Sequence, residues 1–121
     1  LMRSSAASDV YKRQVRLSFT TEHPMMYVAM KDGRISNPVI LRIDPSVVYL
    51  QHTMYADMNA TTTKRTPNIG KSLEDFKKIH FSTVKAHKHF DLDENERPYF
   101  QAEVMVMTFI PKKYIINLDT F

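Results

Sequence analysis

One carboxylate stands inside an apolar run near the C-terminal end of the chain. The run FQAEVMVMTFIP covers residues 100–111, and Glu103 is its only charged residue. Read as a strand, the run alternates its faces, so Gln101 and Glu103 point the same way and lie about 7 Å apart. A carboxylate half-buried in a strand is unfavourable unless something compensates its charge. The pair Gln101-x-Glu103 is therefore the first candidate for a chemical site.

Glu103 also has a purely structural interpretation. It could sit at an exposed sheet edge and pair with Lys112 or Arg97, both close by in the sequence. Isolated acids on strands are usually surface residues. The residue types alone leave both interpretations open, a surface ion pair and a functional carboxylate.

Other short motifs are incomplete. The segment NIGKS at 68–72 resembles a phosphate loop, but Arg65 stands where that motif needs its first glycine, so a helix cap explains it better. His87 and His89 precede the acids of 91–96, yet their spacing matches neither a calcium loop nor an HExxH site. We expect a solvated loop and no metal site there. No G-x-S-x-G elbow is present to support serine-nucleophile chemistry.

The composition is that of one globular domain. The chain has 121 residues, of which 43% are hydrophobic and 25% charged. No run approaches the roughly 18 apolar residues of a membrane span, and no signal peptide opens the chain. Cysteine is absent, which excludes disulfides, thiolate nucleophiles and cysteine-based zinc sites. These features favour a cytoplasmic protein without a membrane partner.

Residues 1–14, LMRSSAASDVYKRQ, do not continue any strand or helix pattern. The piece DVYKRQ reads as the translation of a sequencing-library transposon end, so we interpret 1–14 as an assembly scar and 15–121 as the C-terminal portion of a domain. A natural disordered arm is the alternative. Without this segment Lys and Arg fall from 17 to 14 and Asp and Glu from 13 to 12, so the net charge drops from +4 to +2. That balance alone does not argue for a nucleic-acid partner.

Hydrophobic periodicity predicts a mixed α+β domain with a mostly antiparallel sheet and one main helix. Alternating apolar residues predict strands at 15–20, 26–30, 38–44, 100–110 and 114–118. A short helix is expected from Pro45 with Asp44 as its cap, and 51–71 reads as a strand stub and a long loop. The main helix is predicted from Leu73 to about Val84, with Ser72 capping it in a capping box with Asp75.

Several segments resemble the DarT family in the same order along the chain. They are FTTEHPMMY (19–27), PVILRID (38–44), ADMNA (56–60), LEDFKKIHF (73–81), and QAEVMV (101–106) followed by FIP (109–111). The resemblance as a whole runs from about residue 15 to 119, and the QAE strand is its strongest element. The resemblance implies a partial ADP-ribosyltransferase fold, and an enzyme that transfers ADP-ribose from NAD, its co-substrate, to single-stranded DNA.

The same resemblance implies a toxin of a toxin–antitoxin pair, with a macrodomain antitoxin as partner. The family's N-terminal segment, which grips NAD, has no counterpart after residue 14. The resemblance therefore leads us to expect an inactive fragment.

Roles for individual residues follow from the resemblance. Glu103 would be the catalytic carboxylate that stabilises the ribose as nicotinamide leaves. Gln101 would contact the acceptor base, and Arg97 a phosphate or base edge. Asn59 and Asp57 would lie in the loop that reads the base, and Met25 would line the substrate cleft.

A different class of function fits part of the same pattern. Lys77, Lys78 and Lys85 would share the solvated face of the main helix, and Tyr99 and Phe100 could stack on an unpaired base. For Phe100, core packing is favoured over stacking. These features would suit a non-catalytic module that binds single-stranded nucleic acid or a protein.

Overall fold

The computed structural model describes residues 14–86 and 88–120 of the chain. The expected assembly scar therefore lies outside the described residues except for Gln14, as does His87 of the charged connector. None of the helices in the described part is long and apolar enough to cross a membrane.

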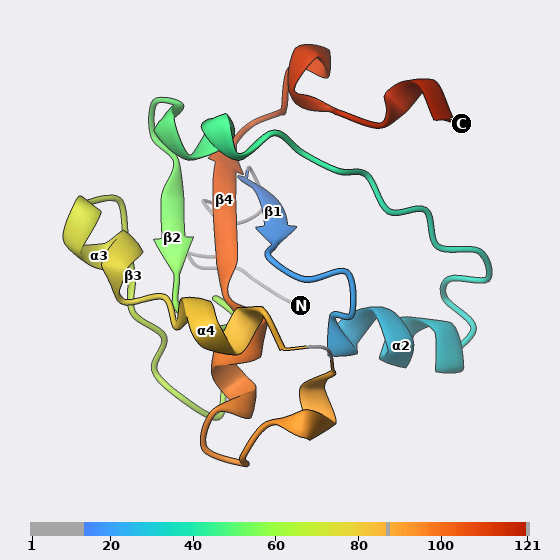
Figure 1. Ribbon diagram of the computed structural model, residues 1–121, viewed down its shortest axis with the longest axis vertical. Helices are drawn as coiled ribbons and strands as arrows, with labels where there is room; N and C mark the ends of the chain where they lie inside the picture. Colours follow the sequence, from blue (N-terminus) through green and yellow to red (C-terminus); the bar gives the residue numbers. More distant parts are fainter. Residues whose placement is uncertain (1–13, 87, 121) are drawn as a thin grey trace.

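A four-stranded antiparallel sheet and several short helices make up the fold, which confirms the α+β prediction (Figure 1). The strands are β1 (Gln14–Ser18), β2 (Met54–Ala56), β3 (Ile69–Gly70) and β4 (Glu103–Met107). The α-helices are α2 (Pro24–Lys31), α3 (Leu73–Lys77) and α4 (Phe81–Val84). The 3-10 helices are η1 (Pro45–Tyr49), η2 (His89–Asp91), η3 (Arg97–Gln101), η4 (Lys112–Tyr114) and η5 (Leu118–Thr120). The strand order is β1-β4-β2-β3, so β4 lies between β1 and β2.

The sheet buries residues on both of its faces. Leu17 is opposite Val104 in the β1–β4 register, and both pack with Val47 in one apolar cluster. On the other face Met105 packs with Ala56 and Ala60. The first four residues of β4 are buried, and the last, Met107, is half-buried. This double burial explains why β4 reads as an almost continuous apolar run.

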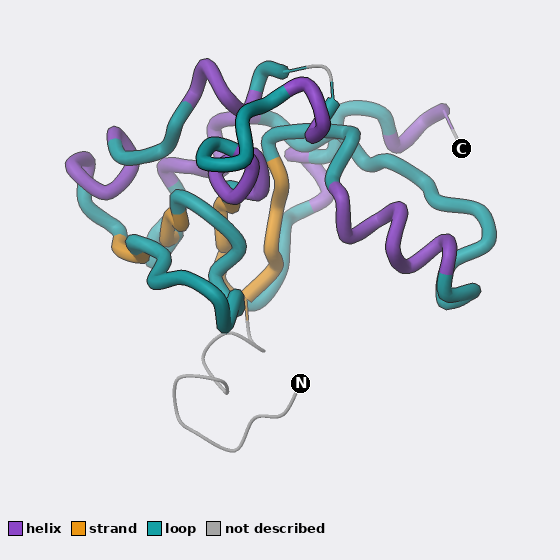
Figure 2. The backbone as a smooth tube through the Cα atoms, turned by 90° about the horizontal axis from the view of Figure 1, so that it is seen from below, coloured by secondary structure: helices purple, strands orange, loops and turns teal. Residues whose placement is uncertain are grey.

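The segment after β1 forms the helix α2 and not the second strand predicted at 26–30. Pro24 occupies the first turn, where its missing N–H is tolerated, and His23 caps the helix by accepting a hydrogen bond from the Met25 N–H. The helix ends at Lys31, Asp32 is its C-cap, and Gly33 follows with a φ of 78°. These local start and stop signals outweigh a short apolar alternation. Figures 1 and 2 both show α2 to one side of the sheet.

The single main helix predicted from Leu73 is divided into α3 and α4. The capping box of Ser72 and Asp75 is present as expected. In a continuous helix Phe76 and Phe81 would point about 140° apart. The break at Lys78 brings their rings into edge contact at 5.2 Å between centroids. It also lets Ile79 enter the core with 3% of its surface exposed.

Two further predicted strands do not join the sheet. Segment 38–44 is extended, but it makes only one isolated bridge among the described residues, from Ile43 to Ile115. The side chain of Asn117 makes the hydrogen bonds that a neighbouring strand would otherwise make. It donates to the Ile40 carbonyl and accepts from the Arg42 N–H. The final segment, predicted as a strand at 114–118, forms turns around η4 and η5. By contrast, η1 begins at Pro45 under an Asp44 cap, as expected.

Candidate active site

Glu103 begins β4, in the interior of the sheet. The register places it opposite Ser18 of β1 and Ala56 of β2. Only 6% of the residue is exposed. The alternative of an exposed edge residue paired with Lys112 or Arg97 is therefore wrong, because β4 has a strand on each side and Glu103 has another partner.

That partner is Arg16 of β1. Its Nε donates to Oε2 of Glu103 at 2.7 Å and its Nη2 donates to Oε1 at 2.6 Å, so the pair is bidentate. The backbone N–H of Ala60 donates to the same Oε1 at 2.7 Å. The Arg16 side chain is 32% exposed and the Glu103 side chain 8%, so the guanidinium faces outward and the carboxylate inward. The acid in the apolar strand is thus compensated by one cation and one backbone donor.

The loop after β2 holds Arg16 in place. Oδ1 of Asn59 accepts from Arg16 Nη2 at 2.7 Å, and Oγ1 of Thr61 accepts from Nη1 at 3.3 Å. Asn59 Oδ1 also accepts from the N–H and hydroxyl of Thr61, both at 3.0 Å, which fixes its side chain. Asp57 accepts a hydrogen bond from the Asn68 N–H and makes no hydrogen bond to Glu103 or Arg16 among the described residues. Of the two loop residues predicted for the site, Asn59 reaches Glu103 through Arg16, and Asp57 closes the base of the loop.

His23 lies beside this network. Burial lowers the pKa of His23, the nearby charge of Glu103 opposes that effect, and the charges of Arg16 and His89 add to it. The ring is therefore neutral at pH 7. Nδ1 accepts the Met25 N–H at 3.1 Å, so the proton of the neutral ring is on Nε2. Met25, which was predicted to line the substrate cleft, is 46% exposed on the first turn of α2 and does not line the larger cavity next to this network, whereas Met26 does.

Gln101 does not share a strand face with Glu103. It is the last residue of η3, and Ala102 separates this helix from β4. The prediction failed because Pro98 opens a helical turn that continues to Gln101, so strand alternation begins only at Glu103.

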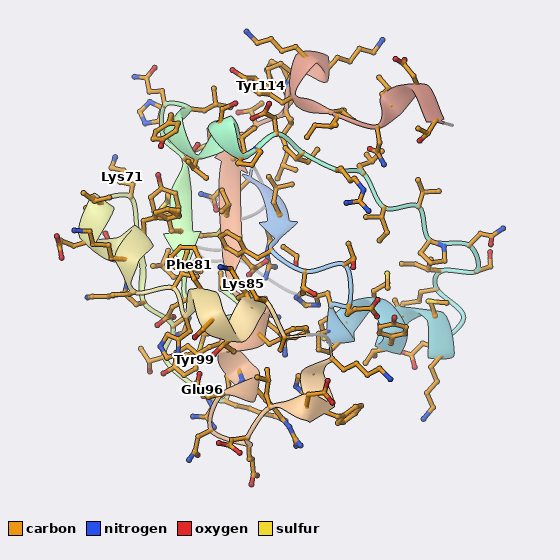
Figure 3. All side chains as sticks on the ribbon, viewed as in Figure 1. Lys71, Phe81, Lys85, Glu96, Tyr99 and Tyr114 are labelled. Carbon is orange, nitrogen blue, oxygen red and sulfur yellow. The ribbon has the colours of Figure 1, made fainter. Side chains whose placement is uncertain are left out.

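The other residues of η3 have separate contacts. Arg97 donates to the Leu92 carbonyl and lies over the Phe90 ring, 5.7 Å from its centroid. The Tyr99 ring stacks on the His80 ring with 3.7 Å between their centroids, near Glu96 and α4 (Figure 3). Phe100 is fully buried, as its core interpretation predicts.

A cavity of about 520 Å³ lies next to this network. Arg16 and His23 line it together with Val104 and the extended segment 39–45. Its volume falls within the usual range for small-molecule sites. Glu103 does not line the cavity, because its side chain lies on the Met105 face of β4 while Leu17 and Val104 line the cavity from the other face. Arg16 is the partner of Glu103 that also borders the cavity. Among the described residues no group of three or more His, Asp and Glu side chains could hold a metal ion.

The sequence patterns did not identify Arg16, His23 or the Ala60 N–H as parts of the site. One signal was present: alternation in β1 sets Arg16 among apolar neighbours, just as alternation in β4 sets Glu103. Two isolated opposite charges on two predicted strands favour a cross-strand pair. Neither alternation predicts the strand order, which is what brings the two charges together.

A family model described as ssDNA thymidine ADP-ribosyltransferase, DarT, matches residues 3–120 of the chain. Among solved structures, the fold is similar to Thermus sp. 2.9 DarT in complex with carba-NAD+, with a TM-score of 0.61 and 16% sequence identity. The match covers 85% of this chain and 55% of the Thermus chain, so this chain spans about half the length of that protein. No curated protein matches the chain.

Proposed function

Since the chain belongs to the DarT family of ssDNA thymidine ADP-ribosyltransferases, we propose that it transfers ADP-ribose from NAD to thymidine in single-stranded DNA, with Glu103 as the catalytic carboxylate. The observation that carries this proposal is the placement of Glu103, which is buried in the sheet and paired with Arg16, a residue that also borders a ligand-sized cavity.

The proposed reaction breaks the bond between nicotinamide and the ribose carbon C1′. The bonding pair leaves with nicotinamide, which becomes neutral, and the ribose gains oxocarbenium-like positive charge, as in glycoside hydrolysis. The ring N–H nitrogen of thymine then bonds to C1′, and its proton is released to solvent. A fixed carboxylate near the ribose stabilises the developing cation, and more strongly where water is excluded.

Glu103 retains capacity for one more hydrogen bond. Each carboxylate oxygen has two acceptor positions. Among the described residues Oε1 accepts two hydrogen bonds, from Arg16 and Ala60, and Oε2 accepts one, from Arg16. We assign the remaining position on Oε2 to a ribose hydroxyl of NAD. Because the Glu103 side chain is only 8% exposed and does not line the cavity, access of NAD to Oε2 is restricted, and we expect little turnover from this chain.

The neighbouring residues would bind the substrates. His23 and Arg16, which border the cavity, would contact NAD there, and Met25, exposed on the first turn of α2, would contact the substrate outside the cavity lining. Gln101, at the end of η3, would contact the thymine, and Arg97 a DNA phosphate. No metal is needed, since the departing nicotinamide is already cationic in NAD.

The family resemblance supports a cellular role as well. The protein would act in the cytoplasm as the toxin of a toxin–antitoxin pair. Its partner would be a macrodomain antitoxin that removes the adduct from DNA.

The test is transfer to a single-stranded oligonucleotide that contains one thymidine. After incubation with NAD, mass spectrometry should show the addition of one ADP-ribose, and the same oligonucleotide with cytidine at that position should stay unmodified. Glu103→Gln keeps the side-chain shape and should lower the transfer rate by about 100-fold or more. Glu96→Gln is the matched control, because Glu96 is hydrogen-bonded to His80 and Thr83 away from Arg16.

Transfer by Glu103→Gln at the rate of the unaltered chain would contradict the role of Glu103. Absence of any product, together with oligonucleotide binding that weakens steeply with salt, would favour the non-catalytic binding module instead.

A further inference from the structure

A second concave site lies on the other side of the α2 N-terminus. This α2–η2 groove has a volume of about 470 Å³, and it is lined by Pro24, Tyr27, Val28 and Lys31 and by residues 88–90. Its lining combines aromatic and aliphatic side chains with two lysines. The mechanism proposed above uses none of these residues.

Two aromatic rings in the groove are exposed. Phe90 is 79% exposed and Tyr27 is 48% exposed, so neither is needed for the core. The Phe90 ring has defined neighbours, with His89 at 5.2 Å between centroids and the Arg97 guanidinium at 5.7 Å. An oriented and exposed ring of this kind is a stacking surface for an unpaired nucleobase, and a guanidinium on the ring adds a cation–π contact.

The charges of the groove suit a phosphate backbone. Lys31 and Lys88 line it, and in the described part of the chain neither pairs with a carboxylate. Of the described residues in the lining, only Glu22 is an acid, and its carboxylate accepts a hydrogen bond from the Tyr27 hydroxyl. Asp91 follows in the same turn but does not line the groove. The groove therefore presents the cations of Lys31 and Lys88 beside its aromatic rings.

The groove adjoins the larger cavity, because the same stretch of chain lines both. Glu22, Pro24 and Tyr27 line the groove, and their neighbours in the chain, Thr21, His23 and Met26, line the cavity. A DNA strand whose thymidine reaches the cavity would thus pass close to the groove with its next nucleotide.

From these observations we infer that the α2–η2 groove binds the nucleobase next to the modified thymidine, stacked on Phe90 and Tyr27, with the adjoining phosphates against Lys31 and Lys88. This inference rests on the proposed function for the identity of the strand. Stacking and phosphate contacts are tolerant of sequence, so we expect little preference for which base occupies the groove.

The test measures binding of a fluorescently labelled single-stranded oligonucleotide by anisotropy, without NAD. Phe90→Ala should weaken binding by roughly fivefold to 150-fold, the range for loss of one stacked base. Phe109→Ala is the matched control, since Phe109 is 64% exposed and lies outside the groove. Lys31→Ala and Lys88→Ala should each reduce the slope of log affinity against log salt by about 0.7.

An abasic nucleotide next to the thymidine sharpens the test. If the groove holds that base, the unaltered chain and Phe90→Ala should bind the abasic oligonucleotide equally. A persistent difference between them, or equal binding of the intact oligonucleotide by Phe90→Ala and Phe109→Ala, would overturn the inference. So would a Phe90→Ala effect confined to self-association in sedimentation, which would make the groove a contact between copies of the chain.

The binding assay separates this inference from the proposed function. Glu103→Gln should abolish most transfer and leave binding unchanged, because Glu103 does not line the groove. Binding that depends on Phe90 without any ADP-ribose transfer would uphold the groove and refute the enzyme. ADP-ribose transfer together with oligonucleotide binding that Phe90→Ala does not weaken would support the enzyme and refute the role of the groove.

Discussion

Glu103 and Asp75 each accept three hydrogen bonds, but they obtain their partners in opposite ways. The partners of Glu103 are Arg16 and Ala60, which lie 87 and 43 residues away in the sequence. The partners of Asp75 are Ser72 and Asn68, three and seven residues away. The first network exists only once the sheet has formed, whereas the second is part of a helix start.

The two carboxylates also differ in their surroundings. Asp75 is partly exposed, and hydrogen bonds from the Ser72 hydroxyl and then from Asn68 lower its pKa. Water can replace those partners when they are removed. Glu103 is buried, so a removed partner leaves a charge in a low-dielectric site. The comparison predicts that substitutions of residues bound to Glu103 lower the free energy of unfolding by more than substitutions of residues bound to Asp75.

The largest loss of stability is expected from Arg16→Ala. Removing the guanidinium leaves the buried carboxylate without its counter-charge and should lower the free energy of unfolding by about 3 kcal/mol. Urea denaturation at pH 7 measures this change. Arg34→Ala is the matched control, since the Arg34–Asp32 pair is exposed and should contribute less than about 1 kcal/mol. Equal losses in the two variants would contradict the contrast between buried and exposed pairs.

A smaller loss is expected from Asn59→Ala, which removes the acceptor that holds Arg16. A hydrogen bond to a partly exposed charged group contributes about 1.5 kcal/mol, and urea denaturation should show a loss of this size. Asn59→Asp keeps the acceptor and should retain most of the stability. An alanine variant as stable as the unaltered chain would show that the loop does not position Arg16.

Ser72→Ala should reduce stability by about 1 kcal/mol, through loss of the helix cap. This change should add to that of Arg16→Ala in the double variant, because β1 and β3 are separated by three strand spacings, about 14 Å. Denaturation of the two single variants and the double variant measures the coupling. A coupling above about 0.5 kcal/mol would show that the two networks are not independent.

The smallest effect should appear in the pH dependence of stability. Because burial lowers the pKa of His23 in the folded state, the unfolded chain binds more protons, and stability falls as pH drops from about 6.5 toward the lowered value. His23→Asn keeps a side chain that can cap α2 and removes this titration. Thermal unfolding between pH 7 and 5 should therefore vary less in His23→Asn. His89, whose pKa burial also lowers, should contribute to the remaining slope.

Local features could be predicted from the sequence. The capping box at Ser72, the Asp44 cap before Pro45 and the strands around Leu17 and Val104 all depend on residues close to one another, and the structure contains each of them. The QAE segment also directed attention to Glu103. The predictions were wrong where a proline or a distant partner decided the structure, as at α2, η3 and segment 38–44.

The site was predictable only in part, for the same reason. A single acid in an apolar strand indicates that some partner exists, but not which one. Lys112 and Arg97 were the nearest cations in sequence, and the sheet brings Arg16 instead. Proximity along the chain was a poor guide because antiparallel pairing of β1 with β4 joins opposite ends of the chain.

Among the described residues β1 is an edge strand, so another strand can pair with its outer side. Within the described residues β1 bonds to β4 along one side only, so its other row of backbone N–H and C=O groups can accept an extended peptide. Arg16 directs its side chain across the sheet toward β4, out of the path of such an addition. An extended peptide paired with this side of β1 would add a fifth strand to the sheet and leave the hydrogen bonds from Arg16 and Ala60 to Glu103 intact.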